Sequence, residues 1–275
     1  MFPIKDNIRL ARFPLVTVVL VAINVVVYLL EIRHGGSFFG GPTNSVEVHY
    51  GAIPYELTHP GTHCALVDVQ TSSGPAEAVG CQHGRFTVGE PGLLGAPGPQ
   101  LAAWQTAFTA MFLHASFLHI FGNMLFLAIF GPAVEDAMGR VRYPVFYLLG
   151  GLVALAAQVA TAPDSTAPTL GASGAIAAVL GGYILLYPRA RVLTLVFIIF
   201  FVTIIEIPAV ALLLIWFGEQ LWLGLEGLAS PLGGEGVAYF AHIGGFVFGL
   251  LLIRLFARTD RGSAGSSAPP ALPVY

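Results

Sequence analysis

Residues Thr169–Gly182 read TLGASGAIAAVLGG and place a single serine, Ser173, at the start of a hydrophobic segment. Gly171 and Gly174 flank this serine, and small residues recur after it, so a second helix can approach the segment closely. A serine at a helix N-terminus is either a helix cap or a nucleophile beside an anion site formed by backbone N–H groups. Residues elsewhere in the chain decide between the two.

The composition predicts a multi-spanning helical membrane protein. Of 275 residues, 56% are hydrophobic and only 10% are Asp, Glu, Lys or Arg, and the mean hydropathy is +0.78. Soluble domains contain about 25% charged residues. No basic patch indicates a nucleic-acid partner. The first apolar run lacks the exit of a cleaved signal peptide and is predicted to be a retained anchor.

Six apolar runs approach the roughly 20 residues that cross a bilayer. The predicted spans are residues 15–32, 111–130, 143–160, 171–187, 208–223 and 237–256. Residues 192–223 are too long for one crossing, and Glu206-Ile207-Pro208 divides them because a charge in mid-bilayer is costly. Residues 192–205 are predicted to lie at the interface or to dip in and out, in a form that suits a short hairpin.

The positive charges predict the orientation. Of the 12 Lys and Arg residues, only Arg33 and Arg85 fall on the side opposite the two termini, so both termini are predicted to be cytoplasmic. The predicted organisation is a cytoplasmic N-terminus (1–14), a membrane domain (15–257) that contains a long extracytoplasmic first loop (35–103), and a disordered cytoplasmic tail (258–275).

Three spans that run in the same direction carry polar residues at one predicted depth. Asn123, Ser173 and His242 lie roughly 18–21 Å above the cytoplasmic ends of their spans, counted at about 1.5 Å per residue. That depth is about 10 Å below the outer surface of a hydrocarbon core about 30 Å thick. Polar groups inside the membrane are costly and usually functional. This pattern predicts Ser173 as a nucleophile and His242 as its general base.

The surrounding residues suit the same chemistry. His119 and Asn123 are four residues apart on one helix face, and with the backbone N–H of Ser173 they are predicted to bind an oxyanion, unless they only bridge helices. No carboxylate lies at this depth to orient His242, so the prediction is a Ser–His dyad whose histidine is held by packing. Gly245 and Gly249 form a small face that can dock on the Gly/Ala face of the fourth span.

These motifs resemble the three signatures of the rhomboid family of intramembrane serine proteases. The resemblance rests on GASG at residues 171–174, AHIGGFVFG at residues 241–249, and a His114-x4-His119-x3-Asn123 pattern. It covers all six spans and implies an all-α polytopic membrane protein, a six-helix bundle. The implied activity is a serine endopeptidase that cuts transmembrane segments of membrane proteins near their outer ends, without a cofactor or metal.

The resemblance also implies roles for individual residues. Ser173 is the expected nucleophile, His242 the base, and His119 with Asn123 the oxyanion site; His114, Gly171, Gly174, Gly245 and Gly249 are expected to support them. Some family members place an aromatic residue one turn after the serine, beneath the histidine. Because Ala177 stands there, Tyr239 or Phe246 is expected to pack against His242 instead.

Two other functions are compatible with the same residues. A catalytically silent relative would bind or route membrane clients, and a transporter would line a path with the same polar residues. The expected partners are transmembrane substrates and the lipid bilayer, in the inner or plasma membrane of a bacterial cell. The family also suggests a gate at the fifth span, which carries Trp216 and Trp222, and a lid at residues 224–236. The sequence does not identify the substrate or the oligomeric state.

The first loop contains both cysteines of the chain. A Cys64–Cys81 disulfide is favoured, because the loop faces an oxidising compartment in the predicted orientation. The pairs His63-Cys64 and Cys81-x-His83 also resemble a Cys2His2 zinc site, and two free thiols are the third alternative.

Overall fold

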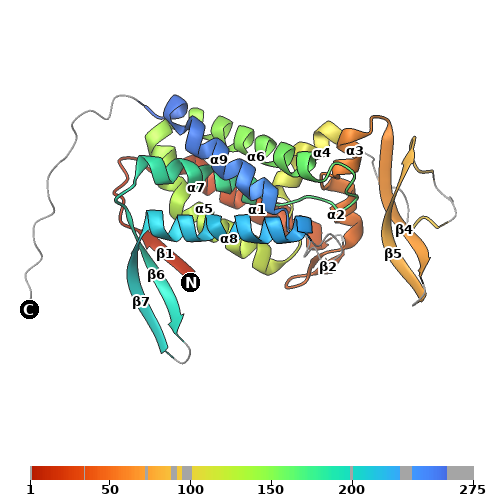
Figure 1. The fold of residues 1–275 in the computed structure, drawn as a ribbon, viewed down its shortest axis with the longest axis horizontal. Coiled ribbons are helices and arrows are strands. Elements are labelled where there is room, and N and C mark those ends of the chain that lie inside the picture. Colours follow the sequence, from red (N-terminus) through yellow and green to blue (C-terminus); the bar gives the residue numbers. More distant parts are fainter. Residues whose placement is uncertain are drawn as a thin grey trace, which may run out of the picture.

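The molecule is an elongated helical bundle with β-structure at both ends (Figure 1). The computed structural model describes residues 2–33, 35–71, 74–87, 92–94, 101–198, 201–229 and 237–258. The predicted disordered tail lies, beyond Arg258, outside the described residues.

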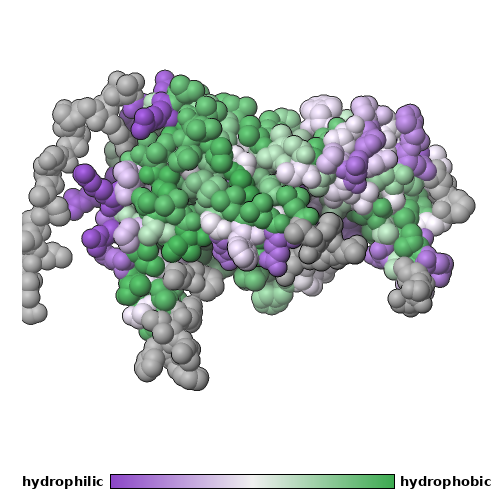
Figure 2. Space-filling view, in the orientation of Figure 1, coloured by the Kyte–Doolittle hydropathy of each residue, from purple (hydrophilic) through white to green (hydrophobic). Residues whose placement is uncertain are grey.

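In the part of the chain that the structure describes, five helices are long and apolar enough to cross a membrane. They are α1 (Leu15–Arg33), α5 (Phe117–Met138), α6 (Arg142–Thr161), α8 (Ala209–Ala229) and α9 (Tyr239–Phe256). Large apolar side chains point outward from them, such as Leu251 and Leu255, which are 69% and 74% exposed. Figure 2 shows a broad hydrophobic surface over the helices, with hydrophilic residues gathered towards the two ends. The chain is therefore a multi-pass membrane protein whose outer surface suits lipid.

A shorter helix, α7 (Ser173–Leu186), lies at the centre of the bundle. Every residue from Gly174 to Ile184 is buried, and the helix packs against α9, α6 and α5. Its residues are apolar all round, which is typical of a helix surrounded by others.

The contact between α7 and α9 brings backbone against backbone. A Cβ atom on Gly245 would collide with the carbonyl oxygen of Gly174, and one on Gly249 would collide with that of Ala178. Glycine is therefore the residue that both positions require, and the two helices are held at the closest separation that their backbones allow.

The second predicted span is misplaced. It was expected at residues 111–130, whereas α5 begins at Phe117, after Ser116 accepts a hydrogen bond from the His119 backbone N–H at 3.2 Å. The helix then continues to Met138, eight residues beyond the predicted end of the span at residue 130. Within this extension Glu135 is buried and accepts three hydrogen bonds from the start of α1, two from Thr17 at 2.7 Å and one from the Val16 N–H at 3.0 Å. These bonds stabilise the buried carboxylate.

A three-stranded antiparallel sheet lies at one end of the bundle (Figure 1). It pairs β1 (Phe2–Asp6) with β6 (Arg191–Ile198), and β6 with β7 (Phe201–Pro208). The β6–β7 hairpin projects away from the helices (Figure 1). It agrees with the prediction for residues 192–205, while the N-terminal strand was not foreseen. β1 is anchored to the central helix, because the Tyr183 hydroxyl donates to Asp6 at 2.8 Å.

The first loop folds at the opposite end of the bundle (Figure 1). Its elements are β2 (Gly36–Ser37), β3 (Gly41–Pro42), α2 (Asn44–Tyr50), α3 (Pro54–Thr58), β4 (Thr62–Thr71), β5 (Gly74–His83), α4 (Ala103–Thr109) and the 3-10 helix η1 (Ala110–Phe112). Cys64 and Cys81 lie directly opposite each other in the β4–β5 pair and are joined by a disulfide. With both sulfurs bonded to each other, neither the zinc arrangement nor the two free thiols is present.

The predicted lid is only partly described. It was expected to begin at Gly224, but α8 is helical through Ala229, so Gly224 and Gly227 belong to the helix and the predicted start of the loop is wrong. The remaining glycines proposed for the lid, Gly233, Gly234 and Gly236, lie outside the described residues.

Candidate active site

Ser173 and His242 meet where two neighbouring helices begin. Ser173 is the first residue of α7, and His242 lies in the first turn of α9. The Ser173 Oγ atom is 2.7 Å from His242 Nε2, a hydrogen-bonding distance across 69 residues of sequence. When a serine hydroxyl is hydrogen-bonded to an imidazole, the imidazole can take the hydroxyl proton and so make the serine oxygen a nucleophile.

The other side of the imidazole is held by α8. Gln220 Oε1 lies 2.7 Å from His242 Nδ1, and the glutamine is buried, with 6% of its surface exposed. Trp216, one helical turn earlier, packs its ring against the imidazole with 5.8 Å between ring centroids. The expectation that packing alone holds His242 is therefore incomplete.

None of the sequence motifs singles out Gln220, and Trp216 was expected only at the gate of the fifth span. Phe246, one of the two aromatics expected against His242, instead stacks on Phe217 at 4.4 Å. A signal for Gln220 did exist, because it lies inside the predicted fifth span, where an uncharged polar side chain is unusual.

His119 borders the serine through Gly171. The Gly171 backbone has a φ of +120°, which side-chain-bearing residues rarely adopt. A Cβ atom on Gly171 would meet the His119 Nε2 and Cε1 atoms at 2.9 Å and the Ser173 Oγ atom at 3.6 Å. The missing side chain thus leaves the edge of the His119 ring and the serine hydroxyl facing one small space.

The positions of Asn123 and His114 are described by their contacts with His119. The Asn123 amide turns back on its own helix, where Nδ2 donates to the His119 carbonyl oxygen at 3.1 Å, leaving one amide hydrogen for another partner. His114 was expected at the top of the second span but lies in the segment between η1 and α5. It is fully buried, with its ring 5.1 Å from that of His119. Among the described residues neither of its ring nitrogens has a hydrogen-bond partner.

A small cavity opens beside Ser173. Its volume is about 30 Å³. Most of its walls are Ala and Gly residues, including Ala110, Gly151, Ala154 and Ala241, and its larger lining residues are Met111, Leu155 and Leu170. A space of this size accepts a methyl group or a water molecule and excludes a large side chain.

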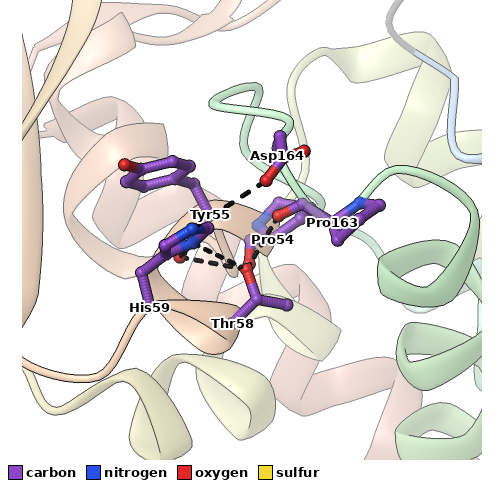
Figure 3. A network of polar contacts seen from close by, with 6 residues as sticks. All are labelled: Pro54, Tyr55, Thr58, His59, Pro163 and Asp164. Carbon is purple, nitrogen blue, oxygen red and sulfur yellow. Dashed lines mark hydrogen bonds and ion pairs between the residues drawn. The ribbon is translucent and has the colours of Figure 1, made fainter.

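The first loop fastens the segment that leads into Ser173. Ala52 and Thr169 exchange two backbone hydrogen bonds, of 3.0 and 2.8 Å. Figure 3 shows α3 facing the turn before the serine, where the Thr58 hydroxyl donates to the Pro163 carbonyl oxygen at 2.8 Å and His59 lies 3.9 Å from Asp164. The extended loop therefore supports the position of Gly171 and Ser173.

Comparisons with known proteins indicate the family to which the chain is related. A family model described as a Rhomboid domain matches residues 101–259, more than half of the chain. The putative rhomboid protease YdcA of Bacillus subtilis is 32% identical over 81 residues, 30% of this chain and 40% of that protein. The mitochondrial rhomboid protein 1 of Saccharomyces cerevisiae is 29% identical over 144 residues, 51% of this chain and 38% of that protein.

A chloroplastic relative is similar over a shorter stretch. The rhomboid-like protein 11 of Arabidopsis thaliana is 38% identical over 74 residues, 27% of this chain and 26% of that protein. The chain spans two fifths or less of the length of these three relatives.

Proposed function

Since the chain belongs to the rhomboid family, we propose that it is an intramembrane serine endopeptidase with Ser173 as nucleophile and His242 as general base. The observation that carries this proposal is the 2.7 Å contact between Ser173 Oγ and His242 Nε2. Polar residues inside a membrane are costly and usually functional, and here two of them from separate helices meet at the N-termini of those helices.

The proposed reaction follows from the positions of these groups. His242 Nε2 takes the Ser173 hydroxyl proton as Oγ attacks the peptide carbonyl carbon, and the tetrahedral intermediate then expels the amine, to which His242 returns the proton. Water hydrolyses the resulting acyl-serine in the same two steps. The backbone N–H of Ser173 and the side chains of His119 and Asn123 are the proposed donors to the oxyanion, and each such donor typically contributes about 3–4 kcal/mol.

The remaining polar and small residues have supporting roles in this proposal. Gly171 makes room for the His119 ring beside the serine, and His114 packs against that ring. Gly174 lets α6 approach, because a Cβ atom there would stand 2.6 Å from the Ala154 methyl. Gly245 and Gly249 keep α7 and α9 together below the dyad.

The proposed topology has six spans and two cytoplasmic termini. The shorter helix α7 is the fourth span in chain order and is added to the five long helices. Residues 1–14 and 258–275 then face the cytoplasm, and residues 35–103 form an extracytoplasmic insertion in a membrane domain of residues 15–257. The Cys64–Cys81 disulfide supports this orientation, because disulfides persist in oxidising compartments. Ser173 then lies near the outer end of the bundle, and cleavage falls near the outer end of a substrate helix.

The proposed substrates are transmembrane segments of other membrane proteins. The cavity of about 30 Å³ beside Ser173 suits a small residue next to the cleaved bond. A bacterial inner or plasma membrane remains a prediction, because the relatives include mitochondrial and chloroplastic proteins as well as one from Bacillus subtilis.

The test is cleavage of a single-span reporter in lipid vesicles by the wild-type chain and by Ser173→Ala. We expect the variant to insert normally and to lose both cleavage and labelling by a fluorophosphonate, which reacts with activated serines. Ser165→Ala, in the turn before the dyad, is the matched control and should retain both. Equal cleavage by Ser173→Ala would end the proposal, and stable client binding without cleavage would favour a silent relative.

A further inference from the structure

The base of the proposed dyad makes its second polar contact with another helix. Gln220 of α8 places Oε1 2.7 Å from His242 Nδ1, on the side of the ring opposite Ser173. The glutamine is 6% exposed and lies on a helix that packs against α9. In the part of the chain that the structure describes, the hydrogen-bond partners of the His242 ring are Gln220 and Ser173, and neither is a carboxylate.

The chemistry of this contact determines where the imidazole carries its proton. An amide oxygen can only accept a hydrogen bond, so His242 Nδ1 must be the donor and carry the hydrogen. In a neutral imidazole the other nitrogen, Nε2, then has a free lone pair, and Nε2 is the atom that faces the Ser173 hydroxyl. This tautomer is the one that can accept the serine proton.

A neutral acceptor also suits the surroundings. A carboxylate buried among apolar helices is costly unless it is paired, whereas an amide needs only its hydrogen bonds. Trp216, on the same face of α8, packs against the imidazole ring and limits its rotation. One helix thus supplies both the contact with the ring and the acceptor for its N–H.

We propose that Gln220 is the positioning residue of His242, which fixes the tautomer and the orientation of the imidazole so that Nε2 faces Ser173. This inference rests on the proposed peptidase function for its effect on rate, although the tautomer itself can be measured without activity. Since the acceptor belongs to α8, the base is correctly oriented only while α8 is docked against α9.

The experiment compares Gln220→Met, which keeps the side-chain length but removes the acceptor, with Gln220→Glu, which keeps an acceptor. We expect Gln220→Met to lower kcat for a single-span reporter, and the rate of fluorophosphonate labelling, by about 10- to 100-fold, as loss of an outer-shell partner does elsewhere. KM should change by less than about twofold, and the thermal unfolding midpoint should change by no more than a few degrees. Gln220→Glu should recover most of the lost rate. Glu219→Gln, an exposed neighbour on the same helix, is the matched control and should remain at the wild-type rate.

Nitrogen-15 NMR of histidine-labelled protein provides the second readout. In the Ser173→Ala background we expect neutral His242, assigned by its loss in a His242→Asn variant, to carry its proton on Nδ1, and we expect Gln220→Met to lose this preference. Wild-type rates in Gln220→Met, equal losses in Gln220→Met and Gln220→Glu, or a proton on Nε2 would each overturn the inference. An inactive wild-type chain with the proton on Nδ1 would instead retain the positioning role and reject the proposed peptidase.

Discussion

Adding one methyl group at Gly245 should separate the two residues of the proposed dyad. A Cβ atom built on Gly245 would stand 2.1 Å from the carbonyl oxygen of Gly174, whereas real Cβ atoms essentially never come closer than 3.0 Å to another atom. That oxygen belongs to the backbone and cannot rotate away. The helices α7 and α9 must therefore move apart by about 0.9 Å at this point.

The position of Gly245 determines what this movement does. It lies one turn after His242, and the oxygen it meets belongs to the residue that follows Ser173. If the movement is transmitted in full, the 2.7 Å Ser173–His242 distance grows to about 3.6 Å, beyond hydrogen-bonding range. A misplacement of about 1 Å costs about 100-fold in rate, and overpacking costs about 1–3 kcal/mol of stability.

The assay is reporter cleavage together with fluorophosphonate labelling and thermal unfolding, for Gly245→Ala and two matched variants. Gly249→Ala makes a similar clash with Ala178 but one turn further from His242, so it should lose comparable stability and much less activity. Gly218→Ala, on α8, places its methyl in open space and should leave activity unchanged. Wild-type cleavage by Gly245→Ala, or equal losses of activity at Gly245 and Gly249, would refute the reasoning.

Three further predictions concern the substrate, the first loop and the hairpin. A reporter with alanine before the cleaved bond should exceed one with leucine by about 10-fold or more in kcat/KM, because the cavity of about 30 Å³ excludes the larger side chain; equal values would argue against this cavity as the subsite. Replacing Cys64 and Cys81 together by serine should lower the stability of the β4–β5 hairpin by about 3 kcal/mol and make the hairpin sensitive to limited proteolysis. Cleavage of the reporter should stay within twofold of wild type, because the hairpin projects beyond the bundle (Figure 1). Val202 is an exposed apolar residue of β7, and Gln70 lies on β4. For a nitroxide spin label at Val202 in lipid vesicles, collisions with oxygen should exceed collisions with a water-soluble nickel complex, and the order should be reversed for a label at Gln70. A label at Val202 that is reached mainly by the nickel complex would show that the β6–β7 hairpin does not lie at the membrane interface.

That Ser173 and His242 lie at a common level could be predicted because helices have a constant rise. Ser173 and His242 are each followed by an apolar run that ends at charged residues, so counting residues from those ends placed both at one level. Glycine spacing then indicated which faces meet, since only residues without a Cβ allow the contacts that Gly245 and Gly249 make. Both inferences use local chain geometry, which the sequence contains directly.

The limits of α5 could not be predicted in the same way. A carboxylate such as Glu135 reads as the end of a span when it is considered alone. In the structure Glu135 lies inside α5, which continues to Met138, and its three hydrogen bonds come from Val16 and Thr17, about 120 residues earlier in the chain. The pairing of β1 with β6 is hidden for the same reason, because it joins segments that are far apart in sequence.

Gln220 illustrates a further limit. A backbone contact between α7 and α9 requires glycine at particular positions, so it leaves a spacing that can be read. An acceptor for His242 Nδ1 has no such signature, because several residue types on any neighbouring helix can supply it. Here it comes from α8, which exposes Leu214 and Ile215 on its outer side and packs chiefly on α9. In the proposed mechanism, an outward movement of α8, such as a gate for a substrate helix would make, also removes the acceptor of His242 Nδ1. The proposal therefore predicts that peptide cleavage follows the return of α8.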